Sequence, residues 1–149
     1  MSIEKDITAI ATPAGREVGT TGHNDAKEYI VRRLKDVGVG PYLSKSLECG
    51  YDREGKRFFN IIGLIPGVDV LASPILLGAH YDTCGPFPGA DDNASGVAAV
   101  LEAARLFADL SFEDTVWFVL MGAEEQGSVG SRHMASWLRE MDLDIRGVI

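Results

Sequence analysis

Hydrophobic and polar positions follow two different periods along the chain, and the change of period separates predicted helices from predicted strands. Between about 22 and 37 apolar residues recur every three or four positions, as on the buried face of an amphipathic helix, and Gly38 is placed to end it. Two further helices are predicted, an alanine-rich one over 94–110 and another over about 128–140.

Four segments have the composition of strands. The β-leaning runs 42–51 and 56–65 flank Asp52-Arg53-Glu54-Gly55, which has the composition of a hairpin turn, so we predict two antiparallel strands. The runs 74–79 and 116–121 are continuously apolar without alternation, which is typical of strands covered on both faces.

The order of these elements predicts an α/β fold. The helix over 94–110 supplies the crossover that the two buried strands need in order to lie parallel. With the hairpin added, we expect a mixed β-sheet with central parallel strands and helices on both faces, and another strand beginning at 145–149. In such sheets ligands gather beyond the carboxyl ends of the parallel strands.

Composition narrows the class of protein. The length of 149 residues predicts one domain over 1–149. A net charge of −8 disfavours a nucleic-acid partner, which needs clustered basic residues, and two cysteines are too few for a disulfide framework. The N-terminal residues contain no apolar run typical of a signal peptide, and no segment is long enough for a membrane span. We therefore expect a cytoplasmic protein with no membrane partner.

His80 and Asp82 follow the first buried strand. One imidazole nitrogen can bind a metal ion while Asp82, two residues on and on the same side, accepts the proton of the other nitrogen. Because a histidine near a strand end is more often structural, this pair needs support from other residues.

That support comes from the sequence GADDNASG at 89–96, which opens the crossover helix. Helix capping accounts for one acidic residue, and the glycines account for turn conformations. Capping does not explain why two adjacent acidic residues, Asp91 and Asp92, lie close to His80, where a cation would offset their repulsion. A metal ion is the simpler explanation.

Glu124 and Glu125 follow the second buried strand. They could simply begin the next helix, whose N-terminal dipole favours acidic residues. Adjacent side chains on an extended segment point in different directions, so one glutamate can bind metal while the other accepts a proton from a water molecule. Histidine and carboxylate ligands without a thiolate suit catalytic zinc, cobalt or manganese. Together the three motifs predict a metal-dependent hydrolase.

These motifs resemble those of the M28 zinc peptidases, a family that includes bacterial and fungal aminopeptidases. The resemblance covers nearly the whole chain, from GREVGTTG at 15–22 through NIIG at 60–63 to the three motifs above and Gly130-Ser131. It implies the zinc-peptidase fold and a site with two Zn²⁺ ions.

The resemblance also implies individual roles. His80 becomes a ligand of the first zinc, Asp92 the carboxylate that bridges both, Glu125 a ligand of the second and Glu124 the general base. With Asp82, assigned from its spacing to His80, Glu124 makes up the predicted catalytic pair. A cis peptide bond is implied after Asp92. The implied reaction is hydrolysis of a peptide or aminoacyl substrate by a metal-activated water, whose proton Glu124 takes and passes to the leaving amine.

Two ligands of the family pattern are missing from this chain, an aspartate at the end of the next strand and a later histidine. His23 and His133 lie on predicted helices and match neither. We therefore expect the N-terminal part of a catalytic domain, with weak or absent zinc binding. Two alternatives stay open: a transferase like the glutaminyl cyclases, which use one zinc, and a non-catalytic remnant or interaction module that self-associates through an exposed sheet edge.

Overall fold

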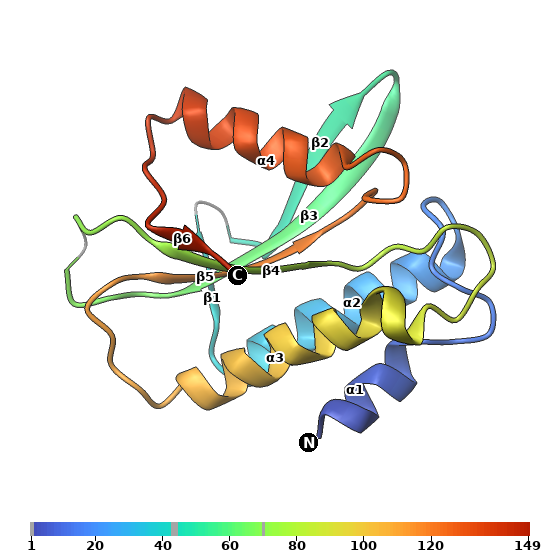
Figure 1. Cartoon of the computed structure of the whole chain (residues 1–149), viewed down its shortest axis with the longest axis horizontal. Helices are drawn as coiled ribbons and strands as arrows, with labels where there is room; N and C mark the ends of the chain where they lie inside the picture. Colours follow the sequence, from blue (N-terminus) through green and yellow to red (C-terminus); the bar gives the residue numbers. More distant parts are fainter. Residues whose placement is uncertain (1, 43–44, 70) are drawn as a thin grey trace.

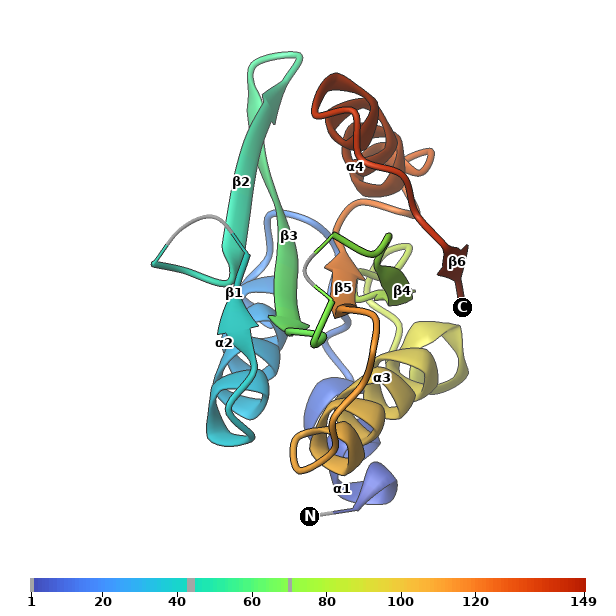
Figure 2. The same ribbon diagram turned by 90° about the vertical axis from the view of Figure 1, so that its left-hand side faces the viewer.

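The structure, a computed structural model, describes residues 2–42, 45–69 and 71–149. It has three layers, with the sheet between a group of helices on one face and a single helix on the other (Figure 1). The helices are α1 (Ile3–Ile10), α2 (Thr21–Asp36), α3 (Ser95–Phe107) and α4 (Val129–Glu140), with a short π-helical segment, η1 (Ala90–Ala94), before α3. The strands are β1 (Gly40–Pro41), β2 (Glu48–Arg53), β3 (Lys56–Ile65), β4 (Ile75–His80), β5 (Val116–Met121) and β6 (Gly147–Val148). Helices α1, α2 and α3 cover one face of the sheet, and α4 covers the other (Figure 2).

The sheet is mixed, as predicted. Its order is β1-β3-β5-β4-β6, and β2 pairs with β3 beside β1. Strands β4 and β5 are parallel neighbours joined through α3, whereas β3 runs antiparallel to β5. β6 adds to the outer edge of β4 in parallel. The prediction of an α/β fold with central parallel strands and helices on both faces is confirmed.

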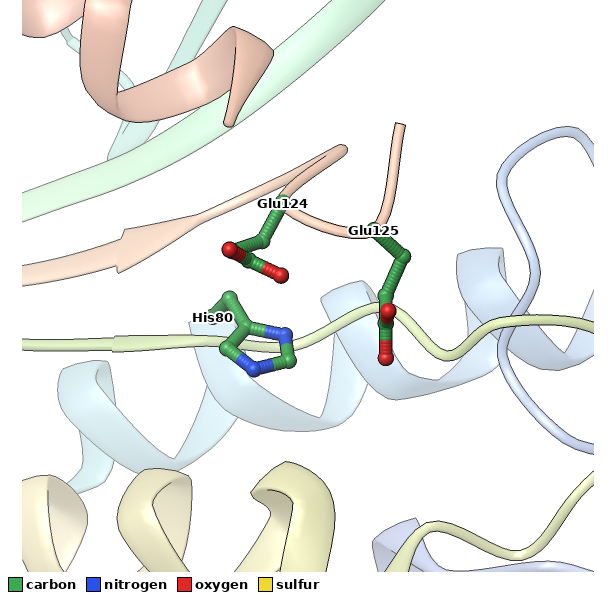
Figure 3. A group of neighbouring side chains, drawn as sticks. All are labelled: His80, Glu124 and Glu125. Carbon is green, nitrogen blue, oxygen red and sulfur yellow. The ribbon is translucent and has the colours of Figure 1, made fainter. Parts of the chain in front are cut away.

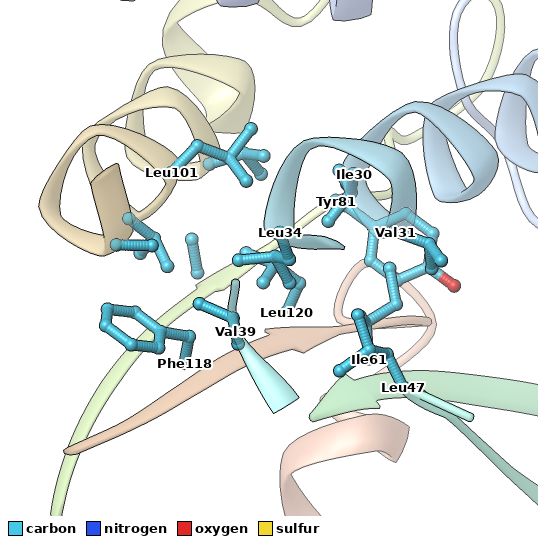
Figure 4. Packing of buried hydrophobic residues seen from close by; sticks show 14 of the residues in the cluster. Ile30, Val31, Leu34, Val39, Leu47, Ile61, Tyr81, Leu101, Phe118 and Leu120 are labelled. Atoms are coloured by element: carbon cyan, nitrogen blue, oxygen red, sulfur yellow. The ribbon is translucent and has the colours of Figure 1, made fainter. Parts of the chain in front are cut away.

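Strand β5 packs its side chains against helices on both faces of the sheet. Successive side chains of a strand point to opposite faces. Val116, Phe118 and Leu120 belong to the larger hydrophobic cluster, shared with α1, α2 and α3 (Figure 4). Trp117 and Val119 belong to a second cluster, which includes Met134 of α4. A continuously apolar strand is therefore required, because each face packs against helices.

The hairpin differs from its prediction in length and turn. β2 begins only at Glu48; Tyr42 lies outside a strand and packs its ring 4.3 Å from that of Trp117, and 43–44 lie outside the described residues. The turn consists of Glu54 and Gly55 alone, both with positive φ, a geometry that suits two-residue hairpins. Asp52 and Arg53 belong to the strand.

Helix α1 was not predicted from the sequence. It is only eight residues long, and three of its residues, Glu4, Lys5 and Asp6, are charged. Ile10 is buried against the core, and Asp6 is fully buried in contact with Arg33 and Tyr29 of α2. Among the described residues, none of the helices is long and apolar enough to cross a membrane.

Candidate active site

The parallel pairing of β4 and β5 brings the predicted site residues to one edge of the sheet. His80 is the last residue of β4 and pairs with Met121, the last residue of β5. Glu124 and Glu125 follow within four residues of that strand end. Figure 3 shows the three side chains converging on the space beyond the two strands.

His80, Glu124 and Glu125 form a group that could hold a metal ion. Each offers one ligand atom, and these atoms lie within 4.8 Å of one another. Two ligands of one zinc ion lie at most about 4.4 Å apart, from two bonds of about 2.2 Å, so small side-chain movements would close the group around an ion. A nitrogen and two carboxylate oxygens, with no thiolate, fit zinc in a catalytic site.

Asp92 lies beside this group but outside it. One carboxylate oxygen lies 3.0 Å from Nε2 of His80, while the side chain is 74% exposed. Its place in η1 comes from a backbone that leaves helical geometry at Asp92 and Asn93, and the Asp92–Asn93 peptide bond is cis, as the family resemblance implied. The aspartate therefore reaches back from the crossover to the imidazole at the end of β4.

Asp82 links the two strand ends. Its carboxylate is completely buried and accepts the backbone N–H groups of Glu124 and Glu125 at 3.0 and 3.1 Å. The carboxylate also lies 3.5 Å from Nδ1 of His80, which is longer than a well-formed hydrogen bond. Burial raises the pKa of Asp82, but the neighbouring His80 and the two N–H donors outweigh it and hold the pKa below its ordinary value.

The sequence anticipated the contact of Asp82 with His80 but not its stronger bonds to the glutamate turn. The same charges act on the imidazole. The carboxylate of Asp82, helped by Glu124 and Asp92, raises the pKa of His80, while partial burial acts in the opposite direction. An imidazole surrounded by three carboxylates is placed to attract a cation.

The turn that carries the glutamates has a tightly constrained backbone. Ala123 is fully buried with φ of 59°, and Ser128 has φ of 57°. The backbone N–H groups of Gly127 and Ser128 both donate to the carbonyl of Glu124. The Ser128 hydroxyl donates to the Glu124 carboxylate at 3.3 Å, so the side chain of the predicted base has a partner in its own turn.

Asn60 is a buried polar residue whose role the sequence did not reveal. From the middle of β3, its amide oxygen accepts the N–H of Gly122 at 3.1 Å and its amide nitrogen donates to the carbonyl of Gly130 at 3.0 Å. Asn60 thus ties β3 to both ends of the glutamate turn. Its position at the start of the NIIG motif was the available signal.

Arg16 is the second residue that sequence reasoning missed. It is fully buried and donates hydrogen bonds to backbone carbonyls of the segment that joins His80 to η1. The other two histidines stand apart from the metal group: His23 stacks on Tyr81 at a centroid distance of 4.8 Å, and His133 stacks on Tyr51 at 4.0 Å.

The fold and this edge define a class of protein, α/β proteins in which a histidine and carboxylates lie beyond the ends of two parallel strands, where a metal ion can bind. The sequence pattern of peptidase family M28 matches residues 60–149. The chain belongs to peptidase family M28.

Individual relatives agree with this assignment. A Mycobacterium tuberculosis protein named "Probable lipoprotein aminopeptidase LpqL" is 40% identical over 136 residues, which cover 87% of this chain and 26% of the relative. The crystal structure of the Legionella pneumophila LapA aminopeptidase superposes with a TM-score of 0.81 at 25% identity, over 99% of this chain and 41% of LapA. Glutaminyl cyclase of Bacteroides thetaiotaomicron superposes with a TM-score of 0.68 at 25% identity, over 83% of this chain and 46% of the cyclase.

The chain is short beside its relatives. It spans between 18% and 26% of the length of the curated relatives that it matches first. The similarity therefore establishes the family and the fold of this part of the relatives.

Proposed function

We propose that this chain contributes the His80, Asp92, Glu124 and Glu125 part of the active site of a zinc-dependent aminopeptidase. The observation that carries the proposal is the convergence of His80, Glu124 and Glu125 within 4.8 Å beyond two parallel strands, with Asp92 against the imidazole. The named aminopeptidases among the relatives support the same activity.

In this proposal each residue has a distinct task. His80, Asp92 and Glu125 hold zinc, and Asp82 orients both His80 and the glutamate turn through the contacts described above. Bound zinc supplies Lewis-acid activation of the scissile carbonyl and of the attacking water. Glu124 takes the proton of that water and returns it to the leaving amine, with the Ser128 hydroxyl orienting its carboxylate.

The direct test loads the full chain with zinc, measures bound metal per chain and follows hydrolysis of aminoacyl chromogenic amides. The isosteric change Glu124→Gln should leave zinc content unchanged and reduce turnover by at least about 100-fold, because only proton transfer is lost. Loss of zinc in this variant would instead make Glu124 a ligand.

A matched pair of substitutions tests the assignment of Asp92. Asp92→Asn should weaken zinc binding by at least about tenfold, whereas Asp91→Asn should not, although both remove one charge from the same turn. The main-chain carbonyl of Asp91 accepts a hydrogen bond from the Ser95 hydroxyl, a contact that the substitution leaves in place. Equal loss in both variants would show that net charge, and not ligation, attracts the ion.

The glutaminyl cyclase neighbour makes a second activity testable on the same preparation. A cyclase would release ammonia from peptides that begin with glutamine, whereas an aminopeptidase would release the first amino acid. Ammonia release without free amino acid would replace the leading proposal by the cyclase.

Self-association through the sheet edge is a separate part of the proposal. β6 is only two residues long at the edge of the sheet, and Val148 and Ile149 are 71% and 81% exposed. Exposed apolar residues on an edge strand favour pairing between chains. Sedimentation velocity of the wild type and of Val148→Lys would detect a dimer that the charge disrupts.

A further inference from the structure

Arg16 is a buried cation that no acidic side chain neutralises by direct contact. Its side chain is 0% exposed, and among the described residues its hydrogen bonds run to carbonyl oxygens alone. Burying an arginine is costly unless its guanidinium is hydrogen-bonded, and here the main chain supplies those hydrogen bonds. Arg16 therefore stabilises the conformation of the backbone that it binds.

The carbonyls that Arg16 binds lie mostly in the segment between His80 and Asp92. Nε donates to Tyr81 at 2.8 Å, Nη1 to Pro88 at 2.5 Å and Nη2 to Gly89 at 3.0 Å. One further bond, from Nη1 to Ile10 at 3.3 Å, anchors the guanidinium to the end of α1. Both ends of the 81–89 segment are therefore attached to one rigid planar group.

The main chain of Arg16 adds a second attachment in the middle of the same segment. Its N–H donates to the Thr83 hydroxyl at 2.7 Å, and its carbonyl accepts the N–H of Thr83 at 3.3 Å. The Thr83 hydroxyl in turn donates to the carbonyl of Gly85 at 3.0 Å. The segment is thus held at its start, middle and end by one residue.

The segment packs closely around these bonds. A Cβ atom at Gly89 would lie 2.4 Å from Cγ2 of Thr83, 2.5 Å from the carbonyl oxygen of Asp92 and 2.9 Å from Nη2 of Arg16. One at Gly15 would lie 2.6 Å from the carbonyl oxygen of Gly85. The glycines allow the arginine and the segment to approach this closely.

We propose that Arg16 is a positioning residue of the metal site. By binding the main chain of the 81–89 segment, Arg16 fixes the positions of His80 and Asp92 relative to each other. His80 precedes the segment and Asp92 follows it, and Nε2 of His80 lies 3.0 Å from a carboxylate oxygen of Asp92. The expected effect of Arg16 on zinc binding rests on the proposed function, whereas the ordering of the 81–89 segment is a property of the metal-free chain. The two claims can therefore fail separately.

The first measurement is amide hydrogen exchange of the full chain without metal, wild type against Arg16→Lys. Lysine keeps the charge but lacks the planar fork of donors, so it cannot bind Tyr81, Pro88 and Gly89 together. Exchange should accelerate at least about tenfold for the N–H groups of Tyr81, Thr83 and Ala94, which are protected by main-chain bonds in this region. Amides of β5 should change far less.

A matched control is available in the other buried arginine, Arg33, which is 3% exposed and binds Asp6 away from the site. Arg33→Lys should accelerate exchange in α1 and α2 and leave the 81–94 amides near their wild-type rates. If both variants accelerate exchange uniformly, in proportion to lost global stability, Arg16 is merely structural and the proposal is overturned.

The second measurement is the dissociation constant for zinc, by competition with a chelating dye at a temperature where all variants are folded. Arg16→Lys should weaken zinc binding by 10- to 100-fold, the usual range for groups that orient ligands, and Arg33→Lys should leave it unchanged. Unchanged affinity in folded Arg16→Lys would overturn the proposal. If the wild type binds too little zinc for a dissociation constant to be measured, hydrogen exchange alone decides the role of Arg16.

A milder pair covers the case in which Arg16→Lys does not fold. Thr83→Val removes the hydroxyl that links Arg16 to Gly85, while Thr83→Ser keeps it. Exchange of the 81–94 amides should accelerate in the valine variant by about three- to tenfold and stay near wild type in the serine variant. Equal exchange in the two variants would overturn the proposal.

Discussion

Arg16 and Arg33 are both buried, yet their surroundings differ completely. Arg33 makes a two-point ion pair with Asp6, at 2.8 and 2.9 Å, and so joins α2 to α1 through charge. Arg16 binds carbonyl oxygens and so orders a loop at the candidate active site. The buried arginine beside a carboxylate therefore stabilises packing between two helices, whereas the one among carbonyls fixes the shape of a segment.

The largest expected effect comes from breaking the ion pair on one side only. Arg33→Met leaves Asp6 charged and buried, with the hydroxyl of Tyr29 as its remaining side-chain partner. We expect a loss of about 3–5 kcal/mol in the free energy of unfolding, measured with urea. Lys35→Met, an exposed change on the same helix, should cost less than about 0.5 kcal/mol. A loss below about 1 kcal/mol for Arg33→Met would contradict the ion pair's part in joining the helices.

Removing both charges should recover most of that loss. In Asp6→Leu combined with Arg33→Met, apolar side chains fill the space without an unpaired charge, and we expect stability within about 1 kcal/mol of wild type. No such rescue exists for Arg16, because its acceptors are main-chain atoms that no substitution removes. A double variant as unstable as Arg33→Met would show that the ion pair contributes more than charge compensation.

A smaller effect is expected at the glycine that Arg16 touches. Gly89→Ala introduces a Cβ into the contact with Thr83 and Arg16 at φ of 54°, and should cost about 1–3 kcal/mol. Gly19 also has a positive φ, 92°, but faces open space, so Gly19→Ala isolates the backbone contribution, about 1 kcal/mol. Thermal unfolding of the pair measures the difference; equal losses would mean that the close contact at Gly89 is readily relieved.

The smallest effect is a dependence of stability on pH that the Asp6–Arg33 pair should show and that the bonds of Arg16 should not. Burial raises the pKa of Asp6, but hydrogen bonds from Arg33 and Tyr29 outweigh it and hold the pKa below its ordinary value of 3.8. A lowered folded pKa means that the pair stabilises the fold above the ordinary pKa, and that this stabilisation is lost as pH falls through the folded value. The advantage of wild type over Asp6→Asn should therefore shrink between about pH 5 and pH 2.

Unfolding curves of the two proteins across that range give the difference directly. Arg16→Lys compared with wild type should show no such trend, because both side chains stay charged throughout and the acceptors are carbonyls. An advantage of wild type over Asp6→Asn that grows on acidification would contradict the lowered pKa.

The sequence predicted elements best where packing imposes a pattern. β5 was placed at its observed bounds because both faces of the strand are buried, and the motifs at His80, Asp92 and Glu124 were placed at one edge because parallel strands end together. Helix α1 was missed because its buried Asp6 looks like a surface residue in sequence. The partner that makes its burial tolerable lies 27 residues away.

Arg16 and Asn60 could not be assigned roles for a different reason. Their partners are main-chain atoms of Tyr81, Gly89, Gly122 and Gly130, and every residue carries such atoms, so no residue type in the sequence marks the contact. The structure was needed to identify which backbone groups they meet. The roles of His80, Asp92, Glu124 and Glu125 as ligands and base stay predictions for the zinc and activity measurements.

Recognition of the 81–89 segment through its backbone has a practical consequence for protein engineering. The guanidinium of Arg16 binds carbonyl oxygens, so these bonds do not depend on the side chains at positions 84 and 87. Cys84 is exposed, and Phe87, in the same segment, is 65% exposed. A combinatorial library randomised at these two positions would keep a fixed scaffold while changing the side chains presented beside the candidate active site.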